Sequence, residues 1–237
     1  MKRIFAIALC VVAMASCQKS TPLTVSPDSI TVYSEGTAQL SATPADGVTY
    51  SVKDDFYAKV DANGLVTGKK VGKTEVTVSS SNGLVNVPVT VLSKYTLYPE
   101  LESLIGASTS KVTSVLGSNY KEGTNSKGQK TYTYTNYNTY TFGIVVTFNG
   151  STCSDIGVVI STTYMTQFVN YLKERYTVAG MQNDYYFFLD HDEKVVITMT
   201  LYNINYMMAI YMPYTSSKAG EMDFSEIEET YRNLTIE

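Results

Sequence analysis

The one histidine of this 237-residue chain is the first candidate for chemistry, because it lies among acidic residues. His191 stands in the run Asp190-His191-Asp192-Glu193, where an imidazole beside carboxylates could bind a metal or transfer a proton. The same run is where a hairpin must turn, and a metal site needs further ligands from elsewhere in the chain. The pattern therefore favours a solvated turn, and we assign His191 neither a metal nor a catalytic role.

Other motifs with a known mechanism are absent from the sequence. It contains no phosphate-binding glycine loop, no CxxC and no HExxH. Asp54-Asp55 could contribute to a calcium site, but calcium takes roughly six to eight oxygen ligands, so we expect two solvated acids. Paired carboxylates that meet only in space stay possible. We predict a protein that is not an enzyme, with no cofactor, no metal and no catalytic residue.

Tyrosine is the remaining unusual feature, since the chain has 20 tyrosines and no tryptophan. Two groups fall on predicted hairpins: Tyr132, Tyr134, Tyr137 and Tyr140 on one, and Tyr202, Tyr206, Tyr211 and Tyr214 on the other. Exposed rings could stack on sugars or form a protein interface. Tyrosine also suits a half-buried sheet face, and the missing tryptophan favours that packing. We keep the first group as candidate ligand-binding residues.

The first twenty residues have the order of an export signal. Two basic residues precede an apolar run over residues 4–15, and small residues then lead into Cys17. The run is too short to span a bilayer. Residues 14–17 resemble the lipobox of bacterial lipoproteins, with Met14 where that family usually has leucine. The resemblance implies cleavage before Cys17 and acylation of that cysteine, including a palmitate-type chain; the alternative is an ordinary cleaved signal.

This anchor predicts the location of the mature protein. Residues 1–16 are a signal peptide and residues 17–22 a lipidated tether, because several acyl chains suffice for stable membrane attachment without spanning. We expect a lipid-anchored protein of the cell envelope, at the outer membrane. No acidic residue occurs before Asp28, which favours the periplasmic face. Both periplasmic and surface exposure stay open.

Charge and cysteine content narrow the partners. Cleavage removes Lys2 and Arg3 and no acid, so the net charge of −4 becomes −6, which argues against nucleic acid or anionic headgroups as partners. With Cys10 lost and Cys17 acylated, Cys153 stands alone, and we expect a half-buried small side chain there. Without the lipid, a Cys17–Cys153 disulfide would become possible.

Residues 23–93 alternate apolar and polar residues in short segments separated by turns such as Asn63-Gly64. Valines occupy every second position from 85 to 91, a pattern typical of an all-β sandwich. Pro88 lacks an N–H, which predicts an edge strand or a bulge there. The motif in residues 60–74 resembles the bacterial Ig-like domain of group 2, and the resemblance extends over residues 23–92. The resemblance implies a spacer or adhesion module without a common catalytic site.

Residues 96–237 change pattern and predict an α+β domain with an internal repeat. Each repeat reads as helical turns followed by a three-stranded antiparallel meander, and a last helix closes the chain. The predicted helices begin near residues 99, 108, 164 and 224, and residues 121–129 read as a polar loop. The predicted strands cover 131–135, 139–148, 152–161, 185–189, 195–202 and 206–214.

Residues 104–117 carry a resemblance to the helical opening of β-lactamase-inhibitor-like repeats and of small outer-membrane assembly lipoproteins. Those families bind other proteins. The sequence therefore predicts a lipid-anchored envelope protein whose Ig-like spacer presents an α+β protein-binding or structural module, with another envelope protein as partner. The alternative is a surface lipoprotein that binds glycans through its tyrosine-rich strands.

Overall fold

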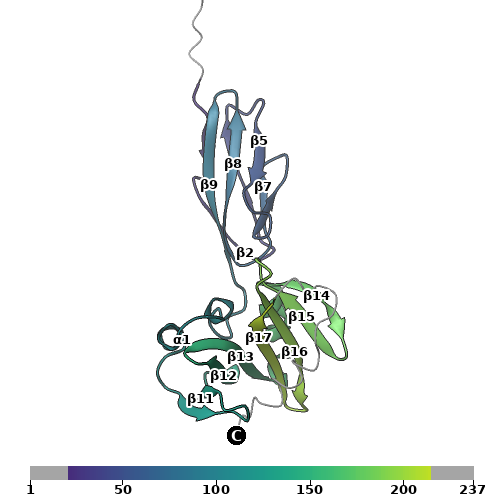
Figure 1. Ribbon diagram of the computed structural model, residues 1–237. Helices are drawn as coiled ribbons and strands as arrows, with labels where there is room; N and C mark the ends of the chain where they lie inside the picture. The colour runs from purple at the N-terminus through teal and green to yellow at the C-terminus, as the bar shows by residue number, and fades with distance from the viewer. Residues whose placement is uncertain (1–20, 215–237) are drawn as a thin grey trace, which may run out of the picture.

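The computed structural model describes residues 21–214, which form two units stacked end to end and joined by one short connection (Figure 1). The predicted signal peptide, Cys17 and the helix expected near residues 224–233 lie outside the described residues. Within the described part, none of the helices combines the length and the apolar character needed to cross a membrane.

The N-terminal unit is a β-sandwich. Its strands are β1 (Thr24–Ser26), β2 (Ile30–Tyr33), β3 (Thr37–Gln39), β4 (Ser41–Thr43), β5 (Thr49–Val52), β6 (Ala58–Val60), β7 (Leu65–Gly68), β8 (Gly72–Ser80) and β9 (Gly83–Leu92). One sheet has the order β2-β9-β8-β5, the second β3-β7-β6, and β1 pairs with β4. The predicted alternation places Val87, Val89 and Val91 in the core between the sheets, each at most 1 % exposed.

Pro88 does not mark an edge strand, so that prediction was wrong. Strand β9 lies between β2 and β8, and Pro88 pairs with Glu75 of β8 without a bulge. Strand β2 begins at Ile30, opposite Val89, so it does not reach the position opposite Pro88. At Pro88 itself, β8 is therefore the one strand that pairs with β9, and the pairing with β2 begins at the next residue.

The C-terminal unit is built on one eight-stranded antiparallel sheet, with the order β10-β11-β12-β13-β17-β16-β15-β14. Its elements are η1 (Glu102–Leu104), α1 (Thr109–Leu116), β10 (Lys121–Thr124), β11 (Lys130–Thr135), β12 (Thr141–Asn149), β13 (Thr152–Ser161), η2 (Thr162–Tyr164), α2 (Met165–Lys173), β14 (Thr177–Gln182), β15 (Tyr185–Leu189), β16 (Val195–Asn203) and β17 (Tyr206–Pro213). The sheet has two halves, β10 to β13 and β14 to β17, which join where β13 pairs with β17.

Two details of the predicted repeat were wrong. Each half has four strands and not three, because β10 and β14 form the outer edges of the sheet. Every residue of these two strands is exposed, so neither shows the alternation that identifies a half-buried strand. The helix predicted to begin at Pro99 is a single turn, η1, which ends before Gly106 adopts a positive φ of 79°.

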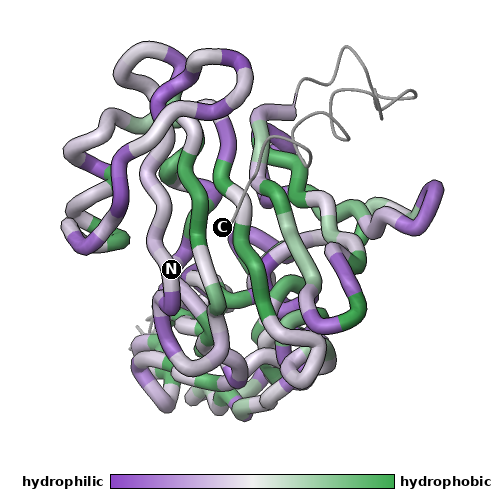
Figure 2. Tube along the Cα trace, turned by 90° about the horizontal axis from the view of Figure 1, so that it is seen from below, coloured by the Kyte–Doolittle hydropathy of each residue, from purple (hydrophilic) through white to green (hydrophobic). Residues whose placement is uncertain are grey.

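Both described α-helices pack on one face of the sheet. Ser108 caps α1 by accepting a hydrogen bond from the Lys111 N–H at 3.3 Å. Helix α2 buries Phe168, Tyr171 and Leu172 against strand side chains such as Ile156 and Tyr211. Figure 2, which looks at the molecule from the end opposite the N-terminal unit, shows hydrophobic segments along the strands of this sheet.

Candidate functional site: the distal end and the junction of the two units

The four tyrosines predicted as ligand-binding residues do not form one exposed row. Tyr132 and Tyr134 are 4 % and 2 % exposed and belong to the core beneath α1. Tyr132 stacks on Tyr120 with ring centroids 3.8 Å apart, and the Tyr134 hydroxyl donates to the Gly117 carbonyl at 3.0 Å. Tyr137 is partly buried against the same core, so Tyr140 alone of the four is exposed.

Tyr140 belongs to a different group, at the end of the sheet that points away from the Ig-like unit. The β15–β16 turn contacts the Ig-like unit, so the β16–β17 turn lies at the far end of β16 (Figure 1). Exposed apolar side chains gather at that far end, and we call them the distal surface: Tyr140, Phe142, Met165, Leu201, Tyr202 and Ile204.

Interactions between the loops hold the distal surface together. The Tyr140 ring meets Tyr164 of η2 edge to face, and Phe142 lies 4.7 Å from the ring of Tyr206. The Thr162 hydroxyl donates to the Ile204 carbonyl at 3.3 Å, which fixes the β16–β17 turn against η2. Ile204 is 85 % exposed, although a large apolar side chain in water contributes nothing to the stability of the fold. Such a concentration of exposed apolar side chains is typical of a contact surface.

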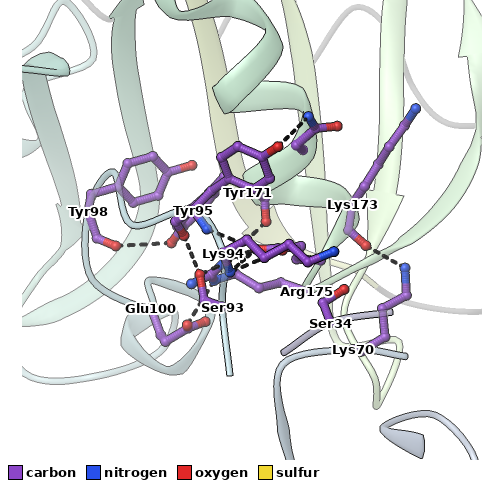
Figure 3. A network of polar contacts seen from close by, with 12 residues as sticks. Ser34, Lys70, Ser93, Lys94, Tyr95, Tyr98, Glu100, Tyr171, Lys173 and Arg175 are labelled. Atoms are coloured by element: carbon purple, nitrogen blue, oxygen red, sulfur yellow. Dashed lines mark hydrogen bonds and ion pairs between the residues drawn. The ribbon is translucent and has the colours of Figure 1, made fainter. Parts of the chain in front are cut away.

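At the other end of the sheet, the two units meet through Glu174, which directly follows α2. Figure 3 shows polar contacts at this junction, with Ser93, Lys94 and Arg175 among the labelled residues. Its buried carboxylate accepts the backbone N–H groups of Lys94 and Tyr95 at 3.1 and 3.2 Å and the Ser93 hydroxyl at 3.3 Å. Its backbone carbonyl accepts the N–H of Val71 from the Ig-like unit at 2.7 Å. One residue therefore holds both the connection and a loop of the first unit.

Arg175 extends this network into the α+β core. Its guanidinium lies 3.8 Å above the Tyr171 ring and makes a 2.8 Å ion pair with Glu100. Below it the hydroxyls of Tyr98 and Tyr211 are 2.9 Å apart. The Tyr171 hydroxyl donates to the Tyr98 carbonyl at 3.1 Å, so each of these buried polar atoms has a partner.

Two further contacts cross the junction. The Lys70 ammonium donates to the Lys173 carbonyl at 2.5 Å, and burial lowers the pKa of Lys70. His191 Nε2 lies 2.7 Å from an Asp54 carboxylate oxygen, and its ring stacks on Phe56 at 4.5 Å. The residues are 137 positions apart, so no local pattern could have predicted this contact. His191 does lie in the predicted turn, but the turn contacts the other unit.

The junction also has an open cavity of about 210 Å³, and the residues that line it include Tyr57, Glu102 and Tyr176. Burial raises the pKa of Glu102, although the Tyr176 hydroxyl donates to its carboxylate at 2.7 Å and opposes that shift. Within residues 21–214, no group of three or more His, Cys, Asp or Glu side chains is arranged to hold a metal ion. Burial raises the pKa of the Cys153 thiol to about 12, so it stays protonated at neutral pH.

Comparison with known proteins identifies the first unit. Residues 19–91 match the model of the Bacterial Ig-like domain (group 2), which confirms the resemblance seen over residues 23–92. No curated protein matches the chain.

Solved structures show only distant similarity. The chain is similar to an intimin mutant from EHEC O157:H7, at 16 % identity and a TM-score of 0.25, covering 47 % of this chain and 85 % of that one. It is similar to the surface layer protein SbsC, at 13 % identity and a TM-score of 0.26 for domains 1–6, covering 81 % of this chain and 21 % of that one. For SbsC domains 5–6 the identity is 11 % and the TM-score is 0.26, and the match covers 84 % of this chain and 86 % of that one. By the family model alone, residues 19–91 are a bacterial Ig-like domain of group 2.

Proposed function

We propose that this chain is a lipid-anchored, non-enzymatic protein of the bacterial cell envelope, in which the Ig-like unit is a spacer and the α+β unit binds another protein. The observation that carries the proposal is the distal surface, an exposed apolar group at the end of the molecule farthest from the lipid-bearing terminus. The lipobox-like residues before Cys17 support the anchor, and the weak resemblance of residues 104–117 to protein-binding repeats agrees with the role of the second unit.

The course of the chain through the Ig-like unit supports the spacer role. Leu23 lies beside the β8–β9 turn, where its N–H donates to the Asn82 carbonyl. The chain leaves the unit at the other end of β9, where Ser93 meets Glu174. Strand β9 has 10 residues, so entry and exit are separated by roughly 30 Å at about 3.3 Å per residue. Such a unit holds its neighbour clear of the membrane surface.

The chemistry of the distal surface indicates the kind of partner. Its members are aliphatic or aromatic, so the partner needs a complementary apolar patch and not a charged groove. Tyr140 and Tyr202 add hydroxyls at the rim, a common composition for protein interfaces. Association there would bury side chains that the fold alone leaves in water.

Affinity capture from envelope extracts tests the proposal. The wild-type chain should recover a partner that is lost when residues 96–237 are deleted and when Leu201→Asp and Ile204→Asp are combined. Leu84→Asp is the matched control, because Leu84 is also apolar and exposed but lies on the Ig-like unit. A partner retained by the distal double variant, or lost with Leu84→Asp, would contradict binding at the distal surface.

Glycan binding is the second candidate, favoured by the exposed rings of Tyr140, Tyr186 and Tyr202. Aromatic rings stack on sugar faces, and a lipid-anchored protein facing outward would meet such ligands. Binding to members of a glycan panel, lost on Tyr140→Ala and Tyr202→Ala, would select this function. Whole-cell proteolysis that leaves the protein intact would exclude an outward-facing role.

The anchor has its own test. Mass spectrometry of the native protein should show an N-terminal acylated Cys17, and Cys17→Ser should release the chain from the membrane fraction. An unmodified thiol at Cys17 would overturn the placement while leaving the binding proposal testable.

A further inference from the structure

A second open cavity, of about 350 Å³, lies at the junction of the two units. Its charged lining residues come from three segments: Glu35, Lys69 and Lys70 from the Ig-like unit, Lys94 from the connection, and Lys173 and Glu174 from the end of α2. Lysines outnumber carboxylates here by four to two, whereas acidic residues outnumber basic ones by 22 to 18 in the whole chain. The positive charge at this cavity is therefore a local feature.

Both carboxylates at the cavity already have partners. The buried carboxylate of Glu174 accepts backbone N–H groups of the connection and lies 3.8 Å from the Arg175 guanidinium. Glu35 pairs with the Lys94 ammonium at 3.2 Å, and its side chain is 84 % exposed, so solvent screens the pair. Neither carboxylate therefore compensates the charge of the other three lysines.

The end of helix α2 does not explain these lysines. Carbonyl groups at a helix C-terminus attract cations, and the Lys70 ammonium donates to the Lys173 carbonyl there (Figure 3). The backbone N–H groups of residues 174–176 donate to the carbonyls of Asn170 and Leu172. Capping of the helix thus accounts for the position of Lys70, but it does not require the other lysines.

The ammonium groups are close enough to influence one another. Burial lowers the pKa of Lys70, and the neighbouring charges of Lys69 and Lys173 lower it further, while Glu35 opposes them. The Lys69 ammonium donates to the Asp55 carbonyl and the Lys70 ammonium to the Lys173 carbonyl. Both acceptors are neutral, so these hydrogen bonds do not cancel the charge. A bound anion would relieve the repulsion between the lysines.

We propose that this cavity binds the phosphate group of a small phosphorylated ligand. Lysine ammonium groups bind phosphate as point charges. Tyr95 adds a neutral donor, because its hydroxyl accepts the Asn170 amide at 3.2 Å and has its own hydrogen to give to a ligand. Pockets for small molecules begin at roughly 300 Å³, so the cavity admits a phosphate with one sugar-sized group. The phosphate would bridge lysines of both units and strengthen the junction.

Soluble ligands and lipid headgroups both carry this phosphate chemistry. The cavity lies at the exit end of the Ig-like unit, roughly 30 Å from the end where the chain enters, at about 3.3 Å per residue of β9. That separation favours a soluble ligand over a headgroup of the membrane that holds the chain. The acidic net charge argues against an extended anionic partner, but it does not oppose one phosphate in a locally basic cavity.

Calorimetric titration of the full chain tests the proposal, with Cys17→Ser so that no acyl group inserts into vesicles by itself. Glucose 6-phosphate should bind at low ionic strength, and glucose should not, because it lacks the phosphate. Raising the salt from about 50 to 200 mM should weaken binding several-fold. Lys69→Gln combined with Lys173→Gln should raise the Kd about tenfold, because two exposed ammonium groups are lost while Lys70 still caps α2.

The matched control is Lys59→Gln with Lys121→Gln, which removes the same charge from exposed positions on β6 and β10 and should leave the Kd unchanged. Circular dichroism should show the same fold for both double variants. Equal weakening in the two double variants would overturn the proposal, since the response would then follow net charge alone. Binding of glucose as tight as that of glucose 6-phosphate would also overturn it.

Vesicles distinguish the source of the phosphate. Phosphatidylglycerol vesicles should not retain the Cys17→Ser chain when phosphatidylcholine vesicles do not. Retention that depends on Lys69 and Lys173, without binding of glucose 6-phosphate, would assign the cavity to a lipid headgroup and overturn the soluble source. Absence of binding to both the sugar phosphate and the phosphatidylglycerol vesicles would overturn the phosphate site itself. None of these variants changes the distal surface, so the outcome is separate from that of partner capture.

Discussion

The two units are held together by different kinds of core. The Ig-like core consists of aliphatic side chains such as Val76, Val87 and Leu40. Among the described residues of that unit, Ser34 is the one buried polar residue. The α+β core contains the fully buried rings of Tyr171 and Tyr211, and the charged Glu174 and Arg175 at its upper edge. An aliphatic core needs only correct alternation, whereas a polar one also needs each partner in place.

The difference matters for where the molecule is vulnerable. A buried aliphatic side chain that is shortened loses contacts in proportion to the atoms removed. A buried polar group that loses its partner is left desolvated without compensation, which is costly for its size. Substitutions in the polar core should therefore be more damaging per atom than those in the Ig-like core.

The largest effect is expected at Glu174. Glu174→Ala leaves the backbone N–H groups of Lys94 and Tyr95 without their acceptor and leaves Arg175 with a weaker partner set. We expect the free energy of unfolding to fall by about 3–5 kcal/mol, the usual cost of removing one member of a buried charged network. Urea unfolding followed by circular dichroism measures it.

The control for this variant is Glu122→Ala, which removes an exposed ion pair with Lys130 at 3.3 Å and should leave stability unchanged. A loss for Glu174→Ala no larger than for the control would mean that the junction does not depend on this carboxylate.

A smaller effect is expected for the paired hydroxyls of Tyr98 and Tyr211. Tyr211→Phe removes one hydroxyl, and the Tyr98 hydroxyl then loses its hydrogen-bond partner. We expect the free energy of unfolding to fall by about 1–2 kcal/mol. The double variant with Tyr98→Phe should cost less than the sum of the two single ones, because no orphaned hydroxyl is left. Tyr33→Phe, at an exposed position of the Ig-like unit, is the matched control. Strict additivity would show that the hydroxyls do not interact.

The pH dependence of stability should also separate the units. Burial raises the pKa of Glu102, so the native state binds its proton more tightly than the unfolded state does. The contribution of Glu102 to the free energy of unfolding is therefore greatest at low pH. It falls as the pH rises from the ordinary pKa of 4.5 through the raised pKa of the folded state. Glu102→Gln should abolish that fall without changing the Ig-like unit. If the stability of the Glu102→Gln variant falls with pH as steeply as that of the wild type, another group causes that fall.

The same contrast explains what the sequence could predict. Alternation and turn residues were enough for the Ig-like unit, and the strands at 152–161 and 185–189 were placed at their observed bounds. The edge strands β10 and β14 were missed because exposed strands carry no alternation. Tyr132 and Tyr134 were open to either interpretation, since tyrosine suits a buried face as well as a binding surface.

The junction could not be predicted, because its residues meet only after both units have folded. Glu174 lies about eighty positions from the N–H groups that it accepts, and nothing near it in the sequence marks that role. The distal surface assembles from three separate segments in the same way. Position in the folded sheet, and not residue type, makes these side chains functional candidates.

The smallest expected effect concerns the contact between His191 and Asp54, which joins the units by their side chains alone. The two side chains are 39 % and 31 % exposed, so solvent screens the pair far more than the Glu174 network. A double-mutant cycle with His191→Ala and Asp54→Ala should give a coupling energy of about 0.2–1 kcal/mol. His191→Phe would keep the stacking on Phe56 and lose only the polar contact, which separates the two contributions. A coupling comparable to the loss at Glu174 would mean that the units are joined as firmly by surface contacts as by the buried carboxylate, and the contrast drawn between the two kinds of core would not extend to the junction.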